Sequence, residues 1–99
     1  MDELNYQRIW RKVFQQDGNP PKTFAADINK TITDIESSGA TGRQNLSMHM
    51  NRFRVYFTDY HTYKDCAELL GISSDAIWRS VALAYRWLRI RMPEYRAKR

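Results

Sequence analysis

The sequence predicts an all-α protein of about five helices, the last of them long. Three observations support this fold class. The chain has only 4 Gly and 3 Pro among 99 residues, too few for the dense turns of a sandwich or barrel. Apolar residues recur at spacings of three and four over most of the chain. Hydrophobic residues make up 42% and charged residues 27%, which is typical of a chain that folds around one core.

The first two predicted helices occupy residues 1–38. Residues 2–16 carry one apolar face, and Asp17-Gly18 with Pro20-Pro21 ends that helix: the face is Tyr6, Ile9, Trp10, Val13 and Phe14. The next helix begins near Thr23, a candidate N-cap, and breaks at Ser37-Ser38-Gly39. Its stripe is Phe24, Ile28, Ile32 and Ile35. We expect the two helices to form a hairpin.

Residues 36–43 are predicted to be a flexible joint, because two glycines and two serines fall within eight residues. The joint divides the chain into a segment of residues 1–38 and a segment of residues 44–99. It also separates two charge regimes. Residues 1–49 have no net charge, so the whole excess of +5 lies beyond them.

Residues 44–58 are predicted to form a third helix with the stripe Leu46, Met50, Phe53 and Phe57. After a loop at residues 59–61, Thr62 is a candidate N-cap for a short fourth helix that runs to Leu70. Gly71 then ends this helix, because glycine takes the left-handed conformation that helix C-termini often adopt.

The fifth predicted helix starts after Ser73 or Ser74, either of which can act as the N-cap. Its stripe is Ile77, Val81, Ala84 and Leu88. Pro93 limits it to about Met92, because the residue before a proline is disfavoured in helical conformation. Its length is then about 25 Å.

Residues 64–81 resemble the helix-turn-helix of Cro and repressor proteins. In that family a small residue lies where two helices cross, a glycine follows four positions later in the turn, and apolar residues flank them. Those positions are occupied here by Ala67, Gly71, Ile72, Ile77 and Val81. The spacing also has a mechanical reason, since two helices approach closely only over a small side chain. A fainter likeness extends to small plasmid, phage and fimbrial regulators of the PapB and KorA types.

This resemblance implies that the fifth helix enters the major groove with its first turns against base edges. The implied base-contacting residues are Ser73, Ser74, Asp75, Trp78 and Arg79. Arg79 is the preferred specificity residue, because a guanidinium can donate two hydrogen bonds to guanine. Asp75 serves either as a carboxylate at the helix N-terminus or as an acceptor for cytosine, and the first is favoured. For Trp78 we favour packing against Ala82 and Tyr85 over contact with thymine.

Basic residues elsewhere are candidates for phosphate contacts, which supply affinity without reading sequence. They are Arg52, Arg54, Lys64, Arg86, Arg89 and Arg91. Two of these, Arg86 and Arg89, can instead cap helix carbonyls or pair with Glu94. The tail from Arg96 to Arg99 either follows nucleic acid or is disordered.

The sequence does not indicate an enzyme, a cofactor or a metal site. His49 and His61 lack acidic neighbours at metal-ligand spacing, and no glycine-rich phosphate loop occurs. Cys66, the single cysteine, falls where the motif needs a small buried residue, so we expect it in the core.

The function indicated by this sequence is that of a sequence-specific double-stranded DNA-binding regulator of transcription, of phage or plasmid type. The alternatives are an antiterminator-like adaptor that docks on RNA polymerase, and an accessory protein of genome packaging or recombination. Residues 1–38 either complete the core or form a homodimer, and dimerisation is slightly favoured. With no apolar stretch after Asp2 and Glu3 and no run of about twenty apolar residues, we expect a cytoplasmic, nucleoid-associated protein without membrane contact.

Overall fold

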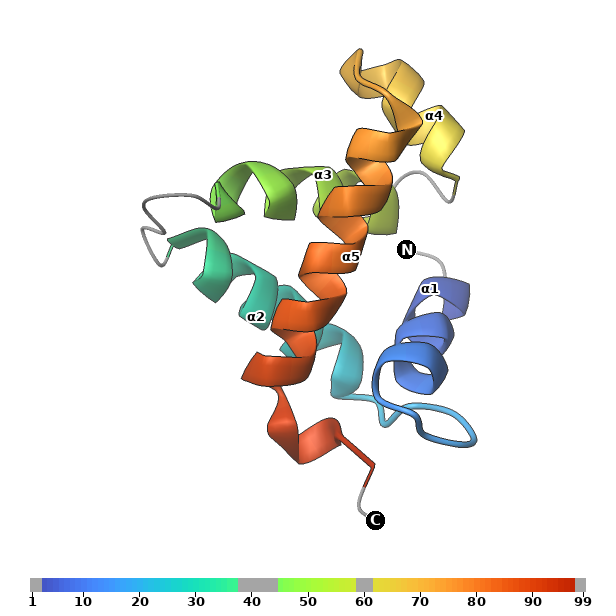
Figure 1. Cartoon of the computed structure of the whole chain (residues 1–99). Coiled ribbons are helices and arrows are strands. Elements are labelled where there is room, and N and C mark those ends of the chain that lie inside the picture. The colour runs from blue at the N-terminus through green and yellow to red at the C-terminus, as the bar shows by residue number, and fades with distance from the viewer. Residues whose placement is uncertain (1–2, 38–44, 59–61, 98–99) are drawn as a thin grey trace.

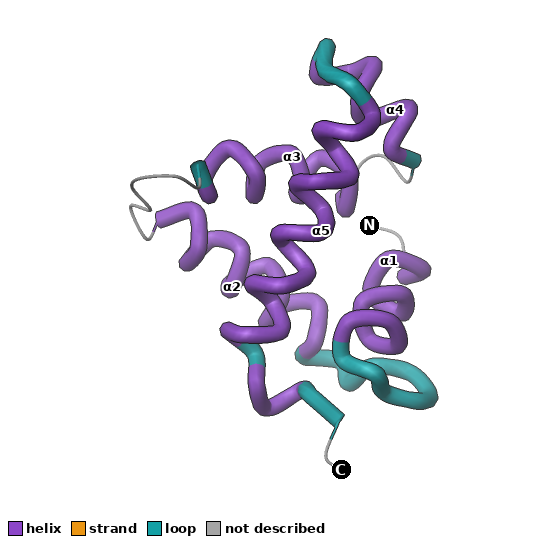
Figure 2. The backbone as a smooth tube through the Cα atoms, in the orientation of Figure 1, coloured by secondary structure: helices purple, strands orange, loops and turns teal. Residues whose placement is uncertain are grey.

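A computed structural model describes residues 3–37, 45–58 and 62–97 of the chain. Helices joined by loops make up all of this described part, which confirms the predicted fold class (Figure 1, Figure 2). The helices are α1 (Glu3–Arg8), η1 (Ile9–Val13), α2 (Phe24–Ser37), α3 (Leu46–Thr58), α4 (Tyr63–Leu70), α5 (Ser74–Arg91) and η2 (Pro93–Tyr95). None of the described helices is both long and apolar enough to cross a membrane.

The first predicted helix is shorter than expected and changes its geometry halfway. It continues from α1 into the π-helix η1, whose wider turn ends at Val13 rather than at Gln16. Gln15 follows with a φ of 55°, a left-handed conformation that turns the chain away from the helix. The indole of Trp10 then donates a hydrogen bond to the Asp17 carbonyl and holds the turn in place.

The predicted hairpin between the first two helices is wrong, because α2 has other principal neighbours. It packs along α3, and the long helix α5 crosses both of them (Figure 1). The first helix meets the N-terminal half of α2: the rings of Trp10 and Phe14 pack edge-on against Phe24 at 5.1 and 5.6 Å, and Asn29 donates to the Tyr6 hydroxyl at 3.1 Å. The apolar stripe of α2 is therefore buried mainly against α3 and α5.

One hydrophobic core joins the two segments of the chain. Its buried side chains come from every described helix from α1 to α5 and include Phe14, Phe24, Phe53, Ile77 and Leu88. The apolar face of residues 1–38 is thus covered by the chain itself, as the core-completion alternative requires. Dimerisation stays a prediction.

The C-terminal tail folds back on the N-terminal part of the molecule. The ring of Tyr95 in η2 packs edge-on against Trp10, Phe14 and Phe24, and its hydroxyl donates to the Asp27 carboxylate. Beyond η2, the Ala97 N–H donates to the Phe14 carbonyl at 3.2 Å. The tail is therefore structured at least as far as Ala97.

Several sequence predictions concern residues outside the described ranges. Most of the joint predicted at residues 36–43 lies there, although α2 itself extends to Ser37. The same holds for residues 59–61, which include His61, and for Lys98 and Arg99. The start of α3 is marked by a cap that the sequence reading missed: the Asn45 side-chain oxygen accepts from the Met48 N–H.

Candidate nucleic-acid interface

The connection from α4 to α5 has the local structure that its sequence predicts. Thr62 caps α4 by accepting from the Asp65 N–H at 3.1 Å. Gly71 has a φ of 66°, and the N–H groups of Gly71 and Ile72 both donate to the Ala67 carbonyl. These two hydrogen bonds to one carbonyl end α4, and the chain turns toward α5 within three residues.

Buried small residues sit behind this turn. Ala67 is 6% exposed and Cys66 is fully buried, which confirms the core position expected for the cysteine. Burial raises the pKa of the Cys66 thiol, so the thiol stays protonated and unreactive at neutral pH. Helices α4 and α5 are thus held together by packing as well as by the turn.

The residues predicted to contact bases all lie on the surface at the N-terminal end of α5. We call this group, Ser73, Ser74, Asp75, Trp78 and Arg79, the reading edge; every member is exposed. Between the two serines, Ser73 is the N-cap, since its hydroxyl accepts from the Ala76 N–H at 3.2 Å. Asp75 follows in the first turn, where its charge complements the helix dipole.

The favoured packing interpretation of Trp78 is wrong. Its side chain is 56% exposed, although it does border a shallow hollow together with Ala82 and Tyr85. The prediction failed because residues 77, 81, 84 and 88 already form the whole core-facing stripe of α5. A tryptophan one position after Ile77 is consequently turned toward solvent.

Arg79 begins a stripe of exposed residues along α5. Ala82, Arg86 and Arg89 follow it at spacings of three and four, so all four share one helix face. From Arg79 to Arg89 the stripe is about 15 Å long. We call this face the arginine stripe, and it concentrates positive charge on the same helix as the reading edge.

The end of the molecule formed by α4 and the first turns of α5 is not itself basic. The exposed residues from 62 to 79 include two basic side chains, Lys64 and Arg79, and three acidic ones: Asp65, Glu68 and Asp75. Any phosphate contacts would therefore have to come chiefly from residues outside this segment.

Two of the predicted phosphate contacts are engaged within the protein. Arg54 forms an ion pair with Glu36 of α2 and also donates to the Thr33 hydroxyl at 3.3 Å. Its charge is thus largely neutralised, and it holds α3 to α2. Arg89 donates through Nε to the Val13 carbonyl at 3.1 Å rather than to its own helix end or Glu94.

The remaining predicted phosphate contacts differ in how accessible they are. Arg86, Lys64 and Arg91 are exposed, whereas Arg52 is half-buried. The guanidinium of Arg91 lies 5.5 Å from the centre of the Trp87 ring, a cation–π distance.

The structure also reveals polar contacts that the sequence reading did not foresee. His49 Nδ1 lies 2.7 Å from the hydroxyl of the fully buried Ser80, which joins α3 to α5. Burial, with a smaller contribution from Arg52, lowers the pKa of His49. Arg8 of α1 donates to the Tyr56 hydroxyl of α3 at 2.7 Å. Only long-range packing creates these pairs, so no local spacing announces them.

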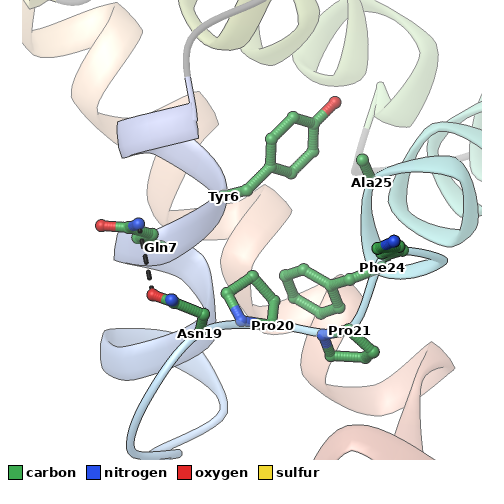
Figure 3. Close-up of a pocket in the computed structure, with 8 residues that line it drawn as sticks. Tyr6, Gln7, Asn19, Pro20, Pro21, Phe24 and Ala25 are labelled. Atoms are coloured by element: carbon green, nitrogen blue, oxygen red, sulfur yellow. Dashed lines mark hydrogen bonds between the residues drawn. The ribbon is translucent and has the colours of Figure 1, made fainter.

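The described surface has further hollows away from the reading edge. One of about 250 Å³ lies between α1 and the Pro20-Pro21 loop, where Gln7 donates to Asn19 at 3.4 Å (Figure 3). Its aromatic residues, Tyr6 and Phe24, are almost completely buried. No group of three His, Cys, Asp or Glu side chains within the described ranges is placed to hold a metal ion.

No protein family, characterised protein or solved structure matches this chain. The likeness of residues 64–81 to Cro and repressor proteins therefore stays a prediction.

Proposed function

We propose that this chain is a sequence-specific double-stranded DNA-binding protein that regulates transcription, of phage or plasmid type, and that it binds rather than catalyses. In this proposal α4, the turn at Gly71 and α5 act as a helix-turn-helix. The first turns of α5 enter the major groove, which is wide enough to admit a helix, while α4 lies across the backbone.

The observation that carries the proposal is the joint exposure of the whole reading edge. Side chains that read bases have to project from a rigid support, because a loose site loses specificity. Here the support is the capped start of α5 with the core packing of Ile77 and Val81 behind it. Had Ser73, Asp75 or Arg79 been buried, this function would have been excluded.

Arg79 is the residue to which we assign base recognition. It is exposed, lies one turn into α5, and forms no hydrogen bond or ion pair with the rest of the described chain. Its guanidinium can therefore donate to O6 and N7 of guanine. Ser73, Ser74 and Asp75 lie at the start of the same helix and would face the bases with it. Trp78 is assigned to contact with a thymine methyl.

Phosphate binding is assigned to Arg86, Lys64, Arg91 and Arg52. Arg54 and Arg89 are left out, because each is engaged within the protein. Because the end of the molecule near Gly71 is slightly acidic, nonspecific affinity should be modest. A homodimer would double these contacts and present two reading edges to a palindromic site, with half-sites about 34 Å apart. We therefore propose that the chain acts as a dimer on DNA.

The first experiment is selection of bound sequences from a random duplex library by the full chain. The proposal requires a shared sequence among the recovered duplexes. Recovery of unrelated duplexes would refute sequence-specific binding.

Arg79→Ala tests the specificity assignment on the selected sequence. We expect the affinity for that sequence to fall about 5- to 150-fold, which corresponds to about 1–3 kcal/mol, while affinity for random duplex changes little. The matched control is Arg11→Ala, because Arg11 is also an exposed arginine but lies on η1. This variant should bind as the wild type does. An equal loss on all sequences would reassign Arg79 to phosphate contact.

Arg86→Ala tests the phosphate assignment through salt dependence. Each phosphate contact adds about −0.9 to the slope of log affinity against log salt concentration. Arg86→Ala should reduce the slope by about one contact and weaken all sequences alike. An unchanged slope would remove Arg86 from the interface.

A protein-docking function is the second candidate, because the reading edge contains one exposed apolar side chain and the end of α4 adds another. Leu69 on α4 is 54% exposed and Trp78 on α5 is 56% exposed, and such pairs mark protein contacts as well as thymine contacts. Gel filtration with RNA polymerase in the presence and absence of DNA separates the candidates. Co-elution without DNA that is lost in Leu69→Ser would favour the adaptor.

A further inference from the structure

A hollow of about 240 Å³ opens on the side of α5 behind the reading edge. Its lining comes from η1, α4 and α5, and Figure 1 shows α1 and α4 on the same side of α5. We call it the aromatic hollow; it is lined by Lys12, Tyr63, Trp78, Val81, Ala82 and Tyr85.

Two of the aromatic rings that line the hollow are held in place by other aromatic rings of the protein. The ring of Tyr63 stacks on that of Tyr56, with centres 5.1 Å apart. The ring of Tyr85 packs edge-on against Phe53 at 5.8 Å. Walls that are already ordered lose little conformational entropy when a ligand binds. Burial raises the pKa of Tyr63 and of Tyr85, so both hydroxyls stay neutral and can donate hydrogen bonds at physiological pH.

The third aromatic wall, Trp78, has an accessible face. More than half of its side chain is exposed, and it packs in no close ring pair with another described residue. An indole in this position can close over a planar ring held against the tyrosines. Two other hollows on the described surface, one between α1 and the Pro20-Pro21 loop and one beside Phe14, lack this feature, since the rings that line them are buried in the core.

The charge of the lining favours an anion. Lys12 is exposed and is the one charged residue among those that line the hollow, while no carboxylate does so. Arg8, which donates to Tyr56 behind the Tyr63 wall, adds positive potential nearby. A ligand with a negative group beside its ring would therefore be complementary.

The volume limits the size of the ligand. Pockets for drug-sized molecules measure about 300–1,000 Å³, and this hollow is smaller. It accommodates one or two fused rings with a short charged substituent rather than a peptide.

We propose that the aromatic hollow is a binding site for a small planar aromatic anion. The ring packs between Trp78 and the two tyrosines, and a carboxylate or phosphate pairs with Lys12. This inference goes beyond the proposed DNA binding and does not depend on it, because the site is complete in the chain alone.

The test is calorimetric titration of the full chain in the absence of DNA. The probes are indole-3-acetate, which carries a carboxylate, and phenyl phosphate, which carries a phosphate; indole, phenol and inorganic phosphate are their matched controls. We expect saturable 1:1 binding of at least one aromatic anion, about two- to fivefold tighter than its uncharged counterpart. The tighter of the two probes identifies the source of the anionic group.

Variants then assign the binding to the hollow. Trp78→Ala should weaken binding about fivefold or more through loss of stacking, and Lys12→Gln about two- to fivefold through loss of charge. Ile90→Ala and Lys30→Gln are the controls, because Ile90 is exposed to the same extent as Trp78 and Lys30 is an exposed lysine on α2. All four changes are at exposed positions, so circular dichroism should show unchanged helix content.

Three results would overturn the proposal. The first is the absence of saturable binding by either aromatic anion. The second is equal binding of inorganic phosphate, which would show that the ring contributes nothing. The third is an affinity that neither Trp78→Ala nor Lys12→Gln changes.

Discussion

Gly71 controls how the chain passes from α4 to α5. Its φ of 66° is readily adopted only by glycine, whereas a Cβ built there meets no atom within 4 Å. The requirement for glycine is therefore conformational and not steric.

Gly71→Ala should lower the free energy of unfolding by about 1–2 kcal/mol, the cost of a left-handed alanine. Urea denaturation followed by circular dichroism measures this loss. Gly71→Asn is the control and should lose less, because asparagine tolerates the left-handed conformation better. Wild-type stability in Gly71→Ala would contradict the geometry of the turn.

His49 should make stability depend on pH. Its folded-state pKa is lowered by burial and by Arg52, so on acidification the unfolded chain takes up a proton first. The free energy of unfolding should therefore fall as pH drops below the unfolded pKa of about 6.5, until folded His49 is protonated as well.

Comparison with His49→Gln isolates this effect, since glutamine does not titrate in this range but can still bond to Ser80. Denaturation curves of both proteins between about pH 5.5 and 8 supply the measurement. The stability difference between wild type and variant should shrink or reverse toward low pH. A difference that is constant with pH would show that His49 does not contribute.

At the scale of the elements, capping and periodicity explain where α4 and α5 lie. Both N-caps are side-chain oxygens that accept from an N–H three residues on, and the apolar spacing fits one buried face. The first helix was predicted less well, because the π-helical η1 and its left-handed exit at Gln15 depend on contacts made far along the chain. One such contact is the Ala97 N–H to the Phe14 carbonyl.

The short helix η2 should stabilise the N-terminal half through Tyr95. Tyr95→Ala removes three ring contacts and the hydrogen bond to Asp27. Fully buried aromatic side chains cost about 3–5 kcal/mol when truncated to alanine, and Tyr95 is half-buried, so we expect about 1–3 kcal/mol. Thermal unfolding measures the effect, with Arg96→Ala as the neighbouring exposed control. Equal stability of the two variants would mean that the tail does not pack in solution.

At the scale of the whole molecule, the two segments of the chain depend on each other. The core that supports α5 includes Phe14, Phe24 and the isoleucines of α2, all from residues 1–38. A segment of about 55 residues has little core of its own.

A fragment of residues 44–99 should therefore not fold cooperatively by itself. Thermal denaturation followed by circular dichroism tests this, with the full chain as the control. Addition of a peptide of residues 1–38 should restore a cooperative transition. A sharp transition in the fragment alone would show that residues 44–99 form an independent domain.

The sequence alone determined the helical class, the Thr62 cap and the glycine that ends α4, because these follow from interactions within a few residues. The position of Cys66 in the motif also predicted its burial. Tertiary structure decided which helices are neighbours, that Arg54 is neutralised by Glu36, and that Lys12 of η1 lines the same hollow as Trp78. Those outcomes depend on which surfaces meet when distant segments pack, and local spacing carries no information about that.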